Sequence, residues 1–192
     1  MFSLVIFLYS FTSKRNNNRK LTKSTVVFVG NSAPFIKQET VNKLLIENNR
    51  DVKSIGKDKL DLNKLENALN AHEMIEKSDV FVSIDGALKA VVKQKTPIAR
   101  FIDGDNSFYI DYKGNRMPLS QNFTARVPLI SGEINKKNSE KIAVLFRIIY
   151  DDEFLKKNII GVQIMPNGSL KMLNRNYNYE IDFSGTLRMN AK

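Results

Sequence analysis

Residues 79–100 read DVFVSIDGALKAVVKQKTPIAR, and their alternating pattern predicts a two-stranded hairpin that runs into a rigid exit at Pro97. Apolar residues recur at every second position before and after the turn, which is the period of a β-strand. They are Val80, Val82 and Ile84 on the first strand and Leu88, Ala90 and Val92 on the second. Between them, the dipeptide Asp85-Gly86 can hold the positive φ angles of a tight turn. No residue of this hairpin carries chemistry, so we interpret it as scaffold.

The residues before the hairpin predict a strand followed by two helices. A strand at 25–29 ends at Gly30. A helical pattern opens at Pro34, stops at Asn48-Asn49, and is followed by a polar loop at 50–59. Asp61 is placed to cap a second helix, whose leucines recur at spacings of three and four. The apolar residues of the two helices are Val41, Leu44, Leu45, Leu62, Leu65 and Leu69. Residues 24–96 are therefore expected to fold as strand-helix-helix-strand-strand, with both helices on one face of a small sheet.

After Pro97 the pattern changes to mostly strands. Short extended runs are predicted at 98–102, 107–112 and 126–130, with a turn at Gly114. Ser139 is expected to cap one amphipathic helix, whose apolar side consists of Ile142, Leu145, Phe146 and Ile149. A hairpin follows around Pro166-Asn167-Gly168, and a last strand runs over 177–183. The fold class is α+β, with a mostly antiparallel β domain at 97–192.

Residue counts exclude several kinds of site. The 192-residue chain has no Cys and one His, so a disulfide, a thiolate nucleophile and a multi-histidine metal site are excluded. We interpret the single histidine, His72, as a surface-loop residue. Residues 103–107 resemble the start of a calcium loop, but Phe108 stands where the loop needs Gly and Gly114 where it needs Glu. We therefore predict a polar turn there, no cofactor or metal, and no enzymatic activity.

Neighbouring carboxylates and tyrosines also have simple structural explanations. Asp151-Asp152 lies at a helix end and is typical of a solvated surface. Tyr177 and Tyr179 could stack on nucleic-acid bases, but one face of a half-buried strand explains them better. We therefore predict neither a nucleic acid nor a small-molecule substrate as partner.

The N-terminus is apolar and then basic. Residues 1–11 read MFSLVIFLYSF, and residues 1–23 hold five Lys/Arg and no acid, half of the net charge of +10. As a helix, the apolar run spans about 16 Å, against a hydrocarbon core of about 30 Å. Tyr9 and the pair Lys14-Arg15 are typical of the interfacial border of a membrane helix. We interpret residues 1–12 as the remnant of such a helix that began upstream, and residues 13–23 as a basic, flexible stalk.

Several blocks of the chain resemble the FtsQ/DivIB cell-division proteins, in the form found in Bacteroidetes-like bacteria. The most specific are Pro97-Ile98-Ala99-Arg100 and the run from Tyr109-Ile110-Asp111 through Gly114 to Met117-Pro118-Leu119-Ser120. Weaker ones are Leu62-x-x-Leu65-Glu66-x-x-Leu69, Val80-x-Val82-x-Ile84-Asp85-Gly86, and Arg126-Val127-Pro128-Leu129-Ile130-x-Gly132. Together they cover nearly the whole chain.

The resemblance implies a POTRA domain and a β domain outside the cytoplasmic membrane, behind a single membrane helix whose N-terminus lies inside. It also implies a non-enzymatic periplasmic scaffold at the division septum, which binds FtsB and FtsL and regulates septal wall synthesis. Family members continue beyond the equivalent of Lys192, so we expect the chain to be truncated at both ends. We predict a partner interface on the last strand, at Tyr177, Tyr179, Ile181 and Phe183.

Two alternatives remain open from the residues alone. A POTRA-bearing factor of outer-membrane protein assembly or secretion would fit the same strand-helix-helix-strand-strand order. A periplasmic enzyme would need a site built from carboxylates alone.

Overall fold

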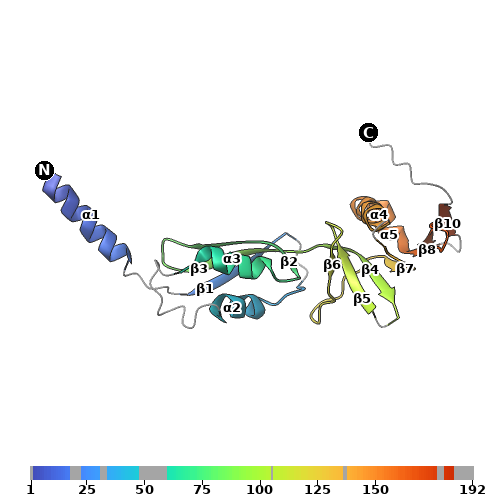
Figure 1. Ribbon diagram of the computed structural model, residues 1–192, viewed down its shortest axis with the longest axis horizontal. Helices are drawn as coiled ribbons and strands as arrows, with labels where there is room; N and C mark the ends of the chain where they lie inside the picture. Colours follow the sequence, from blue (N-terminus) through green and yellow to red (C-terminus); the bar gives the residue numbers. More distant parts are fainter. Residues whose placement is uncertain are drawn as a thin grey trace. The chain divides into compact units, whose positions relative to one another are not determined.

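The computed structural model describes residues 2–17, 23–30, 34–47, 60–104, 106–135, 138–176 and 180–183. The predicted polar loop at 50–59, together with Tyr177, Tyr179 and the chain after Phe183, lies outside these residues. The fold is α+β, as predicted, and the chain divides into two compact units, Met1–Gln94 and Lys95–Lys192. Figure 1 shows the order of the elements along the chain.

The first element is the helix α1 (Phe2–Asn17). The prediction of a flexible stalk from residue 13 is therefore wrong for residues 13–17, which continue the helix, whereas residues 18–22 are not described. The sequence from residue 2 to 17 contains no Gly or Pro that would interrupt helical hydrogen bonds. Within the described residues, no helix is both long and apolar enough to span a bilayer.

The rest of the first unit has the predicted strand-helix-helix-strand-strand order. It consists of β1 (Ser24–Val29), α2 (Gln38–Glu47), α3 (Leu62–Asn70), β2 (Ile75–Val82) and β3 (Leu88–Gln94). The sheet order is β1-β3-β2, with β1 parallel and β2 antiparallel to the central β3. Helix α2 contacts β1, α3 contacts β2, and the two helices contact each other, so they cover the same face (Figure 1).

The core of this unit lies between the helices and the sheet. The predicted apolar positions Leu65 and Leu69 are buried, as are Val41 and Leu45, and the alternating residues of β3 face them. Asp61 caps α3 as predicted, because its carboxylate accepts a hydrogen bond from the backbone N–H of Lys64 at 2.9 Å. Burial of an aliphatic side chain contributes about 1.5–3 kcal/mol, so these helix faces hold the unit together.

Helix α2 begins four residues later than predicted. Pro34 does not open it, because the following residues are diverted into the core. Phe35 and Ile36 are buried, and the N–H of Ile36 donates to the side-chain oxygen of Gln94 at 3.0 Å. This bond fixes the backbone of Ile36 against the end of β3, which delays the helix until Gln38.

The hairpin forms, but its turn differs from the prediction. Among the described residues only glycines have positive φ, so Gly86 (φ +81°) adopts it and Asp85 does not. The N–H of Ser83 donates to the carbonyl of Ala87, and the N–H of Gly86 donates to the carbonyl of Ser83, both at 2.9 Å. This is a three-residue loop with a left-handed glycine. Ile84 therefore lies in the turn, 92% exposed, rather than in a strand.

Hydrogen bonding in this turn affects one acid. The hydroxyl of Ser83 donates to the carboxylate of Asp85, and this bond lowers the pKa of Asp85 below its ordinary 3.8. The strand before the turn starts at Ile75, earlier than its alternation indicates, because a β-bulge between Ile75 and Lys77 interrupts the period of two.

The second unit is built on a mixed seven-stranded sheet. Its strands are β4 (Pro97–Asp103), β5 (Asn106–Asp111), β6 (Arg116–Met117), β7 (Leu129–Ser131), β8 (Ile159–Ile164), β9 (Leu170–Asn174) and β10 (Glu180–Phe183). The spatial order is β10-β9-β8-β7-β4-β5-β6. The pairs of β7 with β4 and with β8 are parallel, and the other pairs are antiparallel.

Two helices accompany this sheet, where one was predicted. The helix α4 (Ser139–Asp151) has the predicted apolar side buried against the sheet, and the short α5 (Glu153–Asn158) follows it. Ser139 is not the cap. Asn138 precedes the helix, and its side chain instead bonds the preceding loop, accepting from the N–H of Asn135 at 2.8 Å and donating to the carbonyl of Glu133 at 2.9 Å.

The strand predicted at 126–130 is shorter than expected. β7 starts only at Leu129, because Pro128 has no N–H for a ladder and the N–H of Ala125 donates to the Tyr109 hydroxyl at 3.0 Å. The predicted polar turn at residues 103–107 is shorter than expected, because Asp103 ends β4 and lies opposite Asn106, which begins β5; Asp105 lies outside the described residues. The hairpin around Pro166-Asn167-Gly168 is confirmed as the connection of β8 and β9.

Gly132, directly after β7, is a position that only glycine fits. Its φ is +98°, and a Cβ atom there would lie 2.3 Å from the carbonyl oxygen of Ile164. Gly168 also has positive φ (+81°), but a Cβ atom would meet nothing within 4 Å.

We therefore expect Gly132→Ala to be clearly more destabilising than Gly168→Ala. The control substitution suffers only left-handed strain, about 1–2 kcal/mol, whereas Gly132→Ala adds an overlap with backbone that costs about 1–3 kcal/mol more. Thermal denaturation followed by circular dichroism measures both. Equal losses of stability in the two variants would contradict the close approach of β7 and β8.

Candidate partner-binding surface

One face of the seven-stranded sheet is covered by α4. The buried residues of β4, β7, β8 and β9 on that face pack with the apolar side of the helix into one core. Its members include Phe101, Ile130, Val162 and Met172 from the strands, and Phe146 and Ile149 from α4. Because side chains alternate across a sheet, the residues between these positions lie on the opposite face.

That opposite face carries a row of residues that crosses the sheet. Arg100 lies opposite Leu129, Leu129 opposite Gly161, and Gly161 opposite Leu173. Leu129 is 46% exposed and Leu173 is 37% exposed, although both belong to regular strands. Nearby Ile160, at the β-bulge of β8, is exposed as well. We call Leu129, Ile160, Gly161 and Leu173 the open face.

Gly161 gives the open face its shape. Its φ is not positive, so the turn geometry that explains other glycines does not apply here. A Cβ atom on Gly161 would lie 3.4 Å from the carbonyl oxygen of Leu129 and 3.4 Å from a methyl group of Leu173. A glycine inside a strand often marks a place where another chain approaches closely. The missing side chain lets Leu173 lie close to Gly161, which is itself buried between the two exposed leucines.

At β5 and β6, the same face of the sheet is covered by other residues. Tyr109 and Met117, which pair across β5 and β6, are fully buried. The hydroxyl of Tyr109 accepts the N–H of Ala125 from the connection between β6 and β7. The apolar residues Tyr109 and Met117 of β5 and β6 are therefore covered on this face, whereas Ile102 of β4, Leu129 and Leu173 are exposed.

β10 lies at the edge of the sheet in the part of the chain that the structure describes, and it pairs with β9. Of the four predicted interface residues, Ile181 lies opposite Met172 and Phe183 lies opposite Leu170. Both partners are buried residues of β9. Tyr177 and Tyr179 lie outside the described residues. Glu180 lies opposite Leu173 and so extends the row of the open face, whereas Ile181 and Phe183 are in register with the face that α4 covers.

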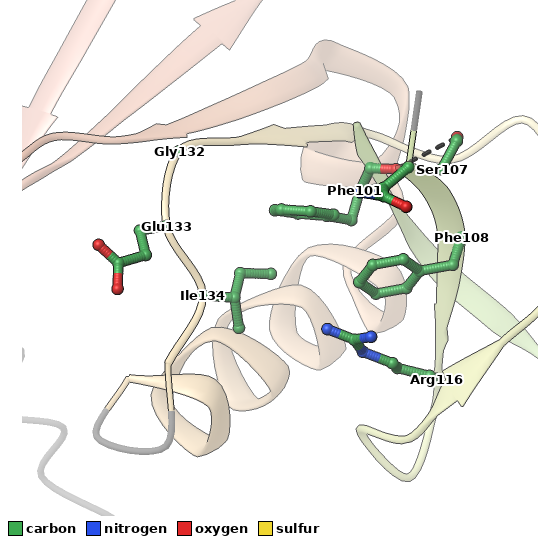
Figure 2. Close-up of a pocket in the computed structure, with 8 residues that line it drawn as sticks. Phe101, Ser107, Phe108, Arg116, Gly132, Glu133 and Ile134 are labelled. Atoms are coloured by element: carbon green, nitrogen blue, oxygen red, sulfur yellow. Dashed lines mark hydrogen bonds between the residues drawn. The ribbon is translucent and has the colours of Figure 1, made fainter. Parts of the chain in front are cut away.

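A separate pocket of about 480 Å³ lies between β4, β5, β6 and the loop after β7 (Figure 2). The rings of Phe101 and Phe108 lie 4.9 Å apart, and the guanidinium of Arg116 stands 4.3 Å from the centre of the Phe108 ring. Glu133 and Ile134 line the side formed by the loop. The two aromatic rings could contact an apolar side chain of a ligand, and the stacked arginine could bind a carboxylate next to it.

Asp111 is the most buried acid among the described residues. One oxygen accepts the N–H of Asn115 at 2.8 Å, while the other lies 3.8 Å from the Lys95 ammonium and has no hydrogen bond. Its backbone also bonds Asn115 and Gly114, so the residue fixes the turn between β5 and β6. We interpret Asp111 as structural, because nothing else in its surroundings points to a ligand.

The other residues considered for chemistry are held in local contacts. His72 lies in the turn between α3 and β2, as predicted, where its Nδ1 accepts the N–H of Met74 at 3.2 Å. Asp151 accepts a hydrogen bond from the hydroxyl of Tyr112 at 2.8 Å, and this bond raises the pKa of Tyr112 above its ordinary 10.0. No group of three acids or histidines suited to a metal gathers within the residues described.

Comparison with known proteins identifies the second unit. Residues 96–192 match the model of a family described as FtsQ/DivIB, C-terminal related. The chain belongs to this family. The match spans the seven-stranded sheet, α4, the open face and β10, and it gives the chain a role in cell division among proteins of the division-site membrane. No curated protein matches the chain.

Local sequence patterns do not predict the open face. Leu129 lies in the extended run predicted at 126–130, Leu173 follows the predicted turn at Pro166-Asn167-Gly168, and these patterns predict no role for Gly161. The available signal is a glycine inside a mostly apolar run at 159–165, which indicates a close approach or a bulge. Which residues flank Gly161 depends on the pairing of β8 with β7 on one side and β9 on the other, and the parallel β7–β8 pair is not visible in local patterns.

The hydrogen bond between Tyr112 and Asp151 predicts a dependence on alkaline pH. The pKa of Tyr112 is higher in the folded chain than in the unfolded one, so its contribution to stability is present below pH 10 and is lost as the pH rises through the folded pKa. We expect Tyr112→Phe to be less stable than the parent below pH 10, with the difference disappearing above it.

Denaturant unfolding at several pH values measures this difference, with Tyr150→Phe as a control on the neighbouring ring, which lies edge-on to Tyr112 at 6.0 Å. Asp151→Asn should bring the pKa of Tyr112 back towards its ordinary value in an ultraviolet titration of tyrosinate. An unchanged titration in Asp151→Asn would contradict the assigned cause.

Proposed function

We propose that the chain is a non-enzymatic scaffold of the divisome that binds FtsB and FtsL and helps to regulate septal wall synthesis. The observation that carries the proposal is the family match over the unit that holds the open face and the edge strand β10. This match favours a role in cell division over the alternative, a POTRA-bearing factor of outer-membrane protein assembly or secretion.

Partner binding is proposed at β10 and the open face beside it. An edge strand offers aligned N–H and C=O groups to an extended partner segment, which gains affinity through backbone hydrogen bonds. Specificity then comes from side chains on the adjoining face, where Leu129 and Leu173 are exposed on either side of Gly161. We keep Tyr177, Tyr179, Ile181 and Phe183 as proposed interface residues, because they belong to the segment that leads into β10 or forms it.

We further propose that residues 24–96 form a POTRA domain and residues 97–192 the FtsQ-type β domain, both on the periplasmic side of the membrane. The order and pairing of β1, α2, α3, β2 and β3 support the first assignment. The apolar first part of α1, followed by Lys14 and Arg15, supports a single-pass anchor at the N-terminal end.

The proposed interface predicts that Leu173→Asp weakens binding of the periplasmic segment of FtsB. An aspartate at position 173 would lose the apolar contact that Leu173 makes with the partner, and its carboxylate would have to give up bound water. At a central contact, such a change weakens affinity by about tenfold or more. Phe154→Asp is the matched control, because Phe154 is also exposed and apolar but lies on α5. Isothermal titration measures both variants, after circular dichroism has confirmed folding. Parent-like affinity of Leu173→Asp would contradict the proposed surface.

The domain assignment predicts that residues 24–96 fold on their own. Their buried side chains pack against one another in a core of the first unit, between two helices and three strands. We expect the isolated segment to melt cooperatively. A broad melt without a cooperative transition would mean that the segment needs the rest of the chain.

A further inference from the structure

The sheet of the first unit has two edge strands, β1 and β2, on either side of β3. Outward-facing N–H and C=O groups on such edges are a template for pairing with another chain. In this unit, groups on both edges are bonded to polar side chains from the helix that lies beside each strand.

At the β2 edge the partners come from α3. The N–H of Ser78 donates to the side-chain oxygen of Asn70 at 2.7 Å, and the N–H of Val80 donates to the carboxylate of Glu66 at 3.2 Å. The hydroxyl of Ser78, which is fully buried, also donates to Asn70 at 3.0 Å and reaches the backbone carbonyl of Glu66 at 3.3 Å. Two acceptors thus occupy the places that carbonyl groups of an added strand would take.

At the β1 edge the partners come from α2 in the same arrangement. The side-chain amide of Gln38 donates to the carbonyl of Val26 at 3.1 Å. The hydroxyl of Ser24 donates to the side-chain oxygen of Asn42 at 3.2 Å. Of these two bonds, only the one from Gln38 reaches the backbone of β1, where the carbonyl is the acceptor and the side-chain amide is the donor, whereas the bond between Ser24 and Asn42 joins two side chains.

The match between helix and strand is geometric. Gln38 and Asn42, like Glu66 and Asn70, are four residues apart on a helix, a rise of about 6 Å. Their partners are two residues apart on a strand, a rise of about 6.6 Å. In both pairs the later helix residue meets the earlier strand residue, so helix and strand run in opposite directions. A helix can therefore cover two successive outward positions of an edge without distortion.

We propose that Gln38, Asn42, Glu66 and Asn70 are edge guards that close the first unit to strand addition. The strand that they exclude is β2 of a second copy of this chain. Two copies present the same edge to each other, and they collide more often as the protein concentration rises. Antiparallel pairing of two β2 edges would place Ser78 opposite Val80 of the other copy and Asp79 opposite Asp79. The inference goes beyond the proposed function, because it concerns the unit outside the family match.

The test uses the absence of Cys from the chain. Asp79→Cys introduces one thiol on exposed β2, so any disulfide must join two copies. In the expected pairing the two Cα atoms are about 4.5 Å apart, within the range of a disulfide. Association through other surfaces does not bring the two thiols together. The full chain is compared in three backgrounds under mild oxidation: the parent, Glu66→Ala/Asn70→Ala, and Asn63→Ala/Asn67→Ala.

Of the three backgrounds, only Glu66→Ala/Asn70→Ala, the unguarded variant, should give a larger fraction of covalent dimer than the parent. Asn63 and Asn67 are the matched control, because they are exposed, four residues apart and on the same helix. At low protein concentration, amide exchange at Ser78 and Val80 should also rise about fivefold or more in the unguarded variant, from loss of one hydrogen bond each. Glu66→Gln, which keeps an acceptor oxygen, should behave as the parent.

The inference is overturned if the unguarded variant shows no more dimer than the Asn63→Ala/Asn67→Ala control and unchanged exchange at both amides. If the double variant does not fold, Asn70→Ala alone decides the matter by the same two measurements, because it removes the shorter of the two bonds.

Discussion

Packing of α4 against one face of the seven-stranded sheet is the interaction on which the second unit depends. Ile142, Leu145, Phe146 and Ile149 recur along one side of the helix and are buried among residues of β4, β7, β8 and β9. Each contributes about 1.5–3 kcal/mol by burial. The helix also bridges strands that are distant in sequence, so that the parallel pairs of β7 with β4 and with β8 are held in place.

One-sided coverage of this sheet has a functional consequence. Because α4 occupies one face, the alternation of side chains directs Leu129 and Leu173 to the other, where they remain exposed around Gly161. The connection between β6 and β7 covers only the end near Tyr109. An exposed apolar face beside a strand edge suits an extended partner segment, which agrees with membership of the FtsQ/DivIB-related family.

The two sheets differ in how the groups on their edge strands are bonded. In the first unit, side chains at a spacing of four on α3 bond two successive backbone N–H groups of β2, and side chains at the same spacing on α2 bond one backbone carbonyl and one serine hydroxyl of β1. In the second unit, the described edge strand β10 lies beside the exposed leucines of the open face, and Glu180 is its residue in register with Leu173. A chain with two sheets can in this way direct a partner strand to one of them, because unpaired backbone groups are costly and are bonded wherever a side chain reaches them.

Much of the fold follows from local patterns in the sequence. Spacings of three and four predicted the buried sides of α3 and α4, Asp61 predicted the start of α3, alternation predicted the first hairpin, and the turn residues 166–168 predicted the second. These features were predictable because they depend on neighbouring residues and on the periods of helix and strand. Tertiary contacts overrode local patterns at Pro34, where Gln94 bonds Ile36, and at Asn138, whose side chain bonds the preceding loop. The open face and the edge guards were decided by tertiary structure alone, because strand order and helix placement bring together residues such as Glu66 and Val80 that no spacing connects.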